Sequence, residues 1–205
     1  MGIVAKTSGD TDFELPPTGF HEASCIWVID LGRQTTPWGP KHQIFINWEL
    51  PRQVIEFEKD GQVVRAPMTI GQFYTLSLFK KAPLRKDLEG WRGQPFTEKE
   101  LQGFDVTKVL GKACSILVEH ETKKNGDEKA VVRAVSKFNG KELPRLHHEL
   151  IVVDDQHPDT SKLPEWFQEK IATQVRDEPN GKPPVDEPEF AGGGGGVAPD
   201  DDVPF

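Results

Sequence analysis

Hydrophobic and polar positions alternate along residues 43–50 with the two-residue period of a β-strand. One face of this segment is apolar and consists of Ile44, Ile46, Trp48 and Leu50. Phe45 lies on the other face among polar neighbours. The same alternation runs through residues 68–79, where Phe73 and Phe79 share the more polar face with Thr75 and Ser77. An apolar run at 23–31 predicts a first strand.

Turn signals divide the remaining β-rich segments. Asp60-Gly61 and Asn125-Gly126 are dipeptides that favour tight hairpin turns. The runs they join are 54–58 with 62–65, and 113–120 with 129–138. Residues 32–40 are rich in Gly, Pro and Thr, and they predict a long loop at the tip of a hairpin between the first two strands.

A helical period appears between the third and fourth strands. Leu84, Leu88 and Trp91 recur at i, i+4 and i+7, which predicts a short helix, and Thr97 with Glu100 forms a capping-box pattern. Residues 146–153 predict a last edge strand. A short helix is expected at 163–174, where it is entered through a proline.

Three strands, a helical insertion and two strands give the chain order of an OB-fold, a five-stranded, partly open Greek-key β-barrel. Other small barrels share five strands, so the order alone is not unique. We expect an N-terminal arm at 1–20, the barrel domain at 21–175, a flexible linker at 176–199 and an acidic tip at 200–205.

Charge is distributed unevenly between these parts. From residue 173 onward there are two basic and eight acidic residues, a net charge of −6 out of the total of −8. The body is therefore almost neutral, and a nucleic-acid partner would have to bind a local basic patch. The linker contains five prolines and a run of five glycines, which predicts a disordered acidic tail.

Two parts of the chain resemble known families. The tip Asp200-Asp201-Asp202-Val203-Pro204-Phe205 resembles the end of bacterial single-stranded DNA-binding proteins, with Val203 where isoleucine is common. Residues 84–101 and 109–114 resemble a group of bacteriophage OB-fold single-stranded DNA-binding proteins, over most of 20–175. The resemblance implies that Asp200, Asp201, Asp202, Val203, Pro204 and Phe205 bind replication or repair proteins, whereas the strand motifs that would identify base-stacking residues do not carry over.

The candidate DNA-binding residues come from the sequence itself, because a sequence-independent site needs aromatic faces for bases and cations for phosphates. They are Arg33, Trp38, Lys41, Phe45, Phe73, Phe79, Lys80, Lys81, Arg85, Lys86, Arg92, Lys123 and Lys124. Alternatives stay open: Trp38 could fold back over the barrel, and helices or the N-terminal arm could cover the three phenylalanines. Trp27, Trp48 and Tyr74 lie among aliphatic residues and are expected in the core.

The sequence offers little for catalysis, metals or membranes. Cys25 and Cys114 form no CxxC pair, and the adjacent His147-His148 would point to opposite faces of a strand. Residues 111–114 lack the glycine spacing and the Ser/Thr of a phosphate loop. We therefore expect no enzyme activity, no cofactor and no metal. Lacking a signal peptide or a membrane-length apolar run, the protein is expected to be soluble and cytoplasmic, in the host cell if phage-encoded.

The function that fits these features is binding of single-stranded DNA during replication, recombination or repair, with recruitment of other proteins through the tip. The alternative is an OB-fold adaptor that mainly recruits replication proteins and binds nucleic acid weakly. The separation of charge also suggests that the acidic tip occupies the basic groove of the body when DNA is absent.

Overall fold

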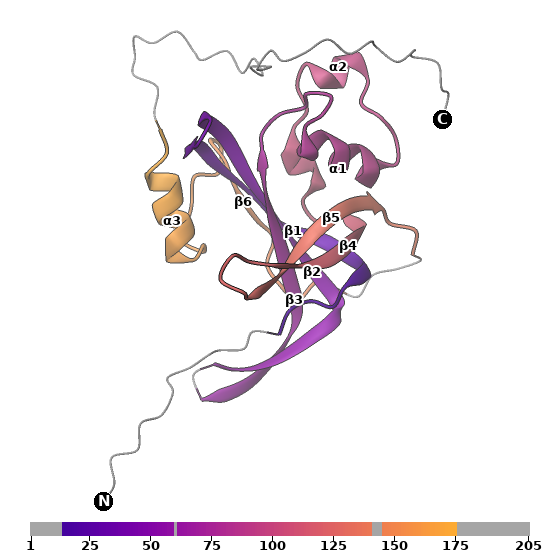
Figure 1. Ribbon diagram of the computed structural model, residues 1–205, viewed down its shortest axis with the longest axis vertical. Coiled ribbons are helices and arrows are strands. Elements are labelled where there is room, and N and C mark those ends of the chain that lie inside the picture. Colours follow the sequence, from indigo (N-terminus) through magenta and orange to yellow (C-terminus); the bar gives the residue numbers. More distant parts are fainter. Residues whose placement is uncertain (1–13, 60, 141–144, 176–205) are drawn as a thin grey trace, which may run out of the picture. The chain divides into compact units, whose positions relative to one another are not determined.

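The computed structural model describes residues 14–59, 61–140 and 145–175, which form a mainly β structure (Figure 1). Its strands are β1 Gly19–Thr36, β2 Gly39–Lys59, β3 Gln62–Thr75, β4 Ala113–Thr122, β5 Glu128–Lys137 and β6 Ile151–Val153. Its helices are α1 Pro83–Arg92, α2 Glu98–Leu101, the 3₁₀ turn η1 Val106–Val109 and α3 Glu165–Ala172. The predicted order of three strands, a helical insertion and two strands is confirmed.

The strands form one sheet in the order β3-β2-β1-β4-β5, in which β1 pairs antiparallel with both β2 and β4. The predicted strand at 146–153 is shorter than expected. Its last three residues form β6, which pairs parallel with β1 from Trp27 to Ile29. The hairpins expected at Asp60-Gly61 and Asn125-Gly126 are confirmed as β2–β3 and β4–β5.

The prediction of a long loop at 32–40 is wrong. The β1–β2 ladder continues to Thr36 opposite Gly39, so Pro37-Trp38 forms a two-residue turn. The register of the ladder shifts between Asp30 and Arg33, where Gly32 has a φ of 66°, and the pairing resumes with Arg33 opposite His42. At the other end of the hairpin, the runs 54–58 and 62–65 are continuations of β2 and β3 rather than separate strands. The third strand ends at Thr75, four residues earlier than predicted.

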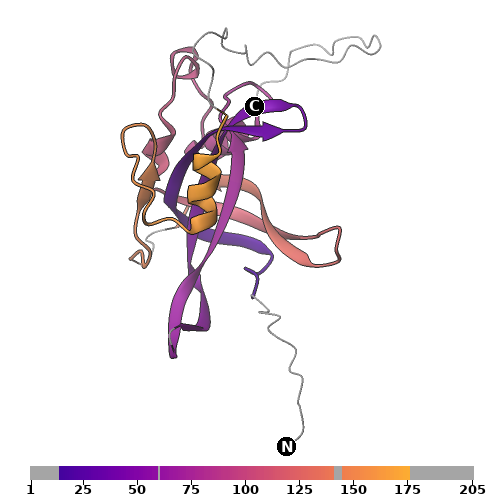
Figure 2. The ribbon, with the colours of Figure 1, turned by 90° about the vertical axis from the view of Figure 1, so that its left-hand side faces the viewer.

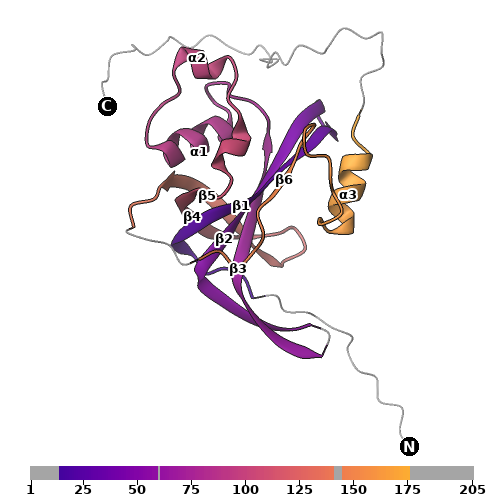
Figure 3. The ribbon, with the colours of Figure 1, turned by 180° about the vertical axis from the view of Figure 1, so that it is seen from behind.

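The two faces of the sheet are covered differently. Helix α1 packs on one face, where Trp48 is fully buried and lies 6.0 Å from the Trp91 ring. Helix α3 packs on the other face, over Ile29, Leu31 and Phe45. Figures 1 and 3 show the two helices on opposite sides of the strands, and Figure 2 shows α3 in front of them. A register shift at Cys25–Trp27 changes which positions of β1 face the α1 core, from Ala23 and Cys25 before it to Val28 after it.

Two of the three aromatic side chains expected in the core are buried there. Trp48 and Tyr74 are buried in the α1 core, and the Tyr74 hydroxyl donates a 2.9 Å hydrogen bond to Asp87. Trp27 is half-buried against the α3 core. The predicted capping box of Thr97 and Glu100 is present at the start of α2. Helix α1 ends at Arg92, and the following Gly93 caps it with a φ of 69°.

Candidate nucleic-acid interface

Three segments that are far apart in the sequence meet at one end of the sheet. The backbone N–H of Leu76, just after β3, donates a 2.8 Å hydrogen bond to the carbonyl of His42 at the start of β2. The backbone N–H of Val175, just after α3, donates a 2.7 Å bond to the carbonyl of Arg33. Residues 33–42, 73–79 and 166–175 therefore form what we name the hairpin end of the sheet.

The hairpin end carries aromatic side chains that are open to solvent. Trp38 is 85% exposed, Trp166 51%, Phe79 50% and Phe73 45%. Trp38 lies in the two-residue turn, where its backbone N–H donates to the Thr36 hydroxyl at 3.3 Å. It does not fold back over the sheet, because a tryptophan that is 85% exposed has almost no contact with the described part of the chain. These rings are available for stacking by a ligand.

Helix α3 supplies a stacked pair of rings. The Trp166 and Phe167 ring centroids are 3.7 Å apart, and Phe167 is buried against Phe45 at 4.8 Å. The Trp166 ring is also 6.4 Å from Phe73, and the Lys170 ammonium lies 5.8 Å from the Phe73 ring centroid. Two half-exposed rings and a cation thus come together from β3 and α3.

Trp166 and Lys170 are absent from the residues predicted from the sequence, although a signal for them existed. In the predicted helix, Phe167 and Ile171 are four residues apart and face the core. Trp166 and Lys170 have the same spacing one position earlier, on the stripe beside the buried one. Trp166 shares this border stripe with a lysine four residues later, and that pattern would have indicated an aromatic side chain at the surface.

Phe45 was predicted as an exposed stacking residue, and this is corrected by the structure. Only 8% of Phe45 is exposed, because α3 lies over it. Its ring sits over Gly71 on β3, where a side-chain carbon would overlap it. The ring is 4.8 Å from that of Phe73, so Phe45 supports the exposed Phe73 from beneath. At this position the alternative that a helix covers the phenylalanine is the correct one.

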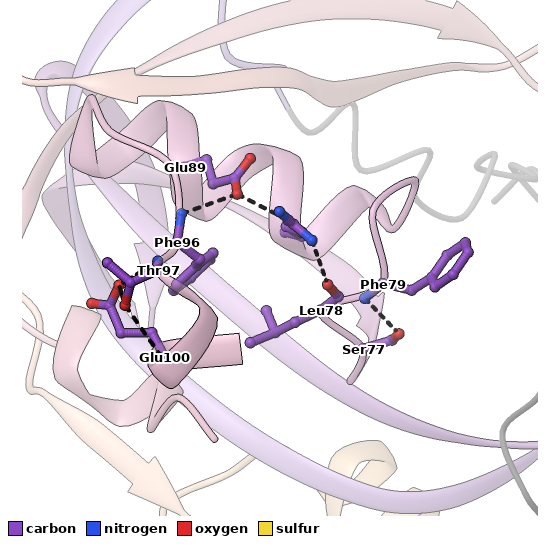
Figure 4. Close-up of polar contacts among 8 residues, drawn as sticks. Ser77, Leu78, Phe79, Glu89, Phe96, Thr97 and Glu100 are labelled. Carbon is purple, nitrogen blue, oxygen red and sulfur yellow. Dashed lines mark hydrogen bonds and ion pairs between the residues drawn. The ribbon is translucent and has the colours of Figure 1, made fainter. Parts of the chain in front are cut away.

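Arg85 was predicted to bind phosphate, but its guanidinium is engaged within the protein (Figure 4). Arg85 Nε donates to Glu89 Oε1 at 2.9 Å, and Nη1 donates to the Leu78 carbonyl at 3.3 Å. Glu89 also accepts from the Phe96 backbone N–H at 3.2 Å. Although burial opposes it, these hydrogen bonds hold the pKa of Glu89 below its usual value. Arg85 therefore ties the segment before α1 to the helix.

Arg92 is likewise committed to internal contacts. Its Nη2 lies 2.6 Å from Glu100 Oε1, and its guanidinium stacks over Phe96 at 4.5 Å from the ring centroid. The Phe104 ring lies on the same guanidinium at 5.5 Å. Hydrogen bonds from Thr97 and then Arg92 lower the pKa of Glu100. Arg92, like Arg85, is therefore engaged within the protein, and its role in a phosphate track stays a prediction.

The remaining predicted cations are lysines and Arg33. Lys80 and Lys81 are exposed directly after Phe79, between β3 and α1, and Lys86 is exposed on α1. Phe79 points away from the rest of the drawn residues in Figure 4. Lys41 and Arg33 are half-buried in the β1–β2 hairpin. The structure places Lys123 and Lys124 in the β4–β5 turn, where Lys123 Nζ is 3.9 Å from Asp127. Of the predicted cations, Arg33 and Lys41 belong to the hairpin end, which also contains Lys170.

A histidine and a carboxylate are paired inside the same hairpin. His42 Nε2 lies 2.7 Å from Asp30 Oδ1, and this hydrogen bond raises the pKa of His42 against the opposing effect of burial.

Within the part of the chain that the structure describes, no group of three His, Cys, Asp or Glu side chains is placed to hold a metal ion. No helix among the described residues is long and apolar enough to cross a bilayer.

Residues 1–13 of the N-terminal arm predicted at 1–20, the linker at 176–199 and the tip at 200–205 lie outside the described residues. The end of the predicted arm is corrected, because Gly19 and Phe20 already belong to β1. Comparisons with known proteins add no family to this picture. The chain matches no protein-family model, and a search of curated proteins finds no similar sequence.

Proposed function

We propose that this chain is a single-stranded DNA-binding protein whose binding surface is the hairpin end of the sheet. The observation that carries the proposal is the group formed by Phe73, Trp166 and Lys170, in which two half-exposed rings lie beside a cation. Exposed rings stack on bases without sequence preference, and lysines attract phosphates. Trp38 and Phe79 extend this aromatic surface, and Lys80 and Lys86 supply further positive charge.

We also propose that the sheet is an OB-fold, a fold that suits the same function. In that fold the first strand pairs with the second and fourth, and a helix separates the third from the fourth. The chain has this connectivity, and β3 also approaches β5 as a partly closed barrel requires. The added C-terminal segment with α3 lies on the outer face of β1 to β3. Stacking on this face is therefore expected at the borders of α3 rather than beneath it.

The proposal is tested by titrating the full chain with oligo(dT) at two salt concentrations, with a duplex and an RNA of equal length as controls. Tryptophan fluorescence is a direct readout, because Trp38 and Trp166 are exposed whereas Trp48 and Trp91 are buried. Tight binding that weakens steeply with salt is expected. Weak binding at low salt would reject the proposal in favour of an adaptor that mainly recruits replication proteins.

The acidic tip is proposed to recruit replication or repair proteins. A terminal phenylalanine with its α-carboxylate can be captured together by one pocket on a partner. Deleting Phe205 should abolish co-precipitation of such proteins from a host extract and leave oligo(dT) affinity unchanged. Equal recruitment by the truncated and intact chains would contradict this role.

A further inference from the structure

Strands β2 and β3 continue beyond the rest of the sheet as a two-stranded arm. Their ladder runs from Val54 opposite Pro67 to Lys59 opposite Gln62, whereas the β1–β2 ladder goes no further in this direction than Glu49. Figures 1, 2 and 3 all show this hairpin projecting away from the helices and from β4 and β5. We name residues 54–59 and 62–67 the β2–β3 arm.

Apolar side chains are exposed on both faces of the β2–β3 arm. Phe57, 42% exposed, lies opposite Val64 on one face. Val54 and Val63, 40% and 77% exposed, lie on the other. A two-stranded ribbon is marginally stable in water, and three or more strands with a shared apolar face are needed for independent stability. The arm therefore has the composition expected of two strands that become stable by pairing with further strands.

The charge of the arm argues against nucleic acid as its partner. Residues 52–66 contain three basic and three acidic side chains, which are Arg52, Lys59 and Arg65 against Glu56, Glu58 and Asp60. Arg65 already lies 3.8 Å from Glu56 across the ladder, and Arg52 is paired with Glu22. A ribbon with no net charge and with exposed apolar side chains has no net attraction for phosphates but can pair with a copy of itself.

The two edges of the arm are not equivalent for self-pairing. A twofold axis at Phe57 on the β2 edge would place Glu56 of one copy opposite Glu58 of the other, and like charges directly opposite are destabilising. On the β3 edge, an axis at Val64 places Val63 opposite Arg65. The segment that would pair, Gln62–Ala66, stops before Pro67, which has no N–H to donate.

We infer that the β3 strands of two copies pair antiparallel, edge to edge, around a twofold axis at Val64. The two arms then form one four-stranded sheet. Across its apolar face, the two Val64 side chains lie side by side with Phe57 of each copy outside them, and the backbone groups of both β3 edges become hydrogen-bonded. This contact is isologous, so it closes as a dimer.

The test is the mass of the full chain in solution, measured by light scattering over a concentration series without nucleic acid. The expected mass is twice the chain mass of 23.0 kDa, falling to one chain mass in Val63→Lys. Val63 is largely exposed, so the substitution should leave the fold intact, which circular dichroism checks. The matched control is Phe20→Lys, on another strand and 71% exposed, which should remain dimeric.

A second measurement fixes the position of the contact. Val64→Cys should form a disulfide-linked dimer on mild oxidation, while Phe20→Cys should not. The native Cys25 and Cys114 are buried and give no background. A wild-type mass of one chain throughout the series, a dimeric Val63→Lys, or a Val64→Cys dimer that does not cross-link would each overturn the inference. So would a Val63→Lys variant that loses oligo(dT) affinity at unchanged mass. The mass needs no DNA, so it is independent of the proposed function.

Discussion

The fully buried carboxylate of Glu49 lies 2.7 Å from the imidazole Nδ1 of His148. The same carboxylate accepts hydrogen bonds from the backbone N–H groups of His147 and His148, at 3.1 and 2.8 Å. Residues 145–150 are thereby fastened to β2. This segment leads directly into β6 and then α3, which pack over Ile29, Leu31 and Phe45. Glu49 therefore anchors the start of the C-terminal segment that covers this face of the sheet.

Replacing Glu49 should destabilise the protein strongly. In Glu49→Ala the two N–H groups and the imidazole lose a buried acceptor, and the loss is expected to be about 3–5 kcal/mol of unfolding free energy. Urea unfolding measures it. The matched control is Glu56→Ala on the same strand, where the ion pair with Arg65 is exposed and should contribute about 1 kcal/mol or less. Equal losses in the two variants would contradict the anchoring role.

The exposed tryptophans should carry much of the affinity for single strands. Trp38→Ala and Trp166→Ala each remove one stacking surface, with an expected loss of about 1–3 kcal/mol, or roughly five- to 150-fold in oligo(dT) affinity. Phe20→Ala is the control, because Phe20 is similarly exposed on a strand but lies outside the hairpin end. Fluorescence anisotropy of a labelled oligonucleotide provides the comparison. If Trp38→Ala and Trp166→Ala both bind as tightly as the wild type, the hairpin end is not the binding surface.

Lysines and arginines near α1 should behave differently on substitution. For Lys80→Ala and Lys86→Ala, the slope of log affinity against log salt should become shallower by about 0.7 for each phosphate that the variant no longer neutralises. Arg85→Ala should leave the slope unchanged but reduce stability by about 1–3 kcal/mol, because Glu89 and the Leu78 carbonyl lose a partly buried donor. Titrations over a salt series and thermal unfolding separate the two effects. If Arg85→Ala changed the slope of log affinity against log salt, Arg85 would be a phosphate ligand after all.

Local patterns were enough to predict most of the elements. The two-residue period located β2, the Asn125-Gly126 dipeptide located the β4–β5 turn, and the spacing of Leu84, Leu88 and Trp91 located α1. Each of these signals depends on neighbours in sequence, such as turn geometry or the side chains on one helical face. The chain order of strands and helices follows from them.

The site could be predicted only in part, because its decisive contacts are long-range. Phe45 has polar sequence neighbours and looks exposed, but a helix more than a hundred residues later covers it. Arg92 looks like a surface cation until Glu100 and two phenylalanine rings enclose it. A strand pattern shows which residues share a face, but it does not show which other element packs on that face.

The pairing of His42 with Asp30 should make stability depend on pH in a defined direction. The hydrogen bond raises the pKa of His42 in the folded state, so the folded protein binds this proton more tightly than the unfolded chain does. The resulting stabilisation is fully present below the unfolded pKa of about 6.5 and is lost as pH rises through the folded-state pKa. Around the imidazole, Asp155 reinforces the shift and Arg33 opposes it.

Urea unfolding of the wild type and His42→Gln over a pH series isolates this effect, because the other five histidines are common to both proteins. The wild type should be the more stable by a margin that shrinks as pH rises through the folded-state pKa. Asp30→Asn serves as the control, since it removes the carboxylate but keeps an oxygen that can accept from the Gly32 backbone N–H. In the Asp30→Asn background, the contribution of His42 to the unfolding free energy should change less with pH. A margin that is constant or grows with pH would show that the Asp30–His42 contact does not hold the proton.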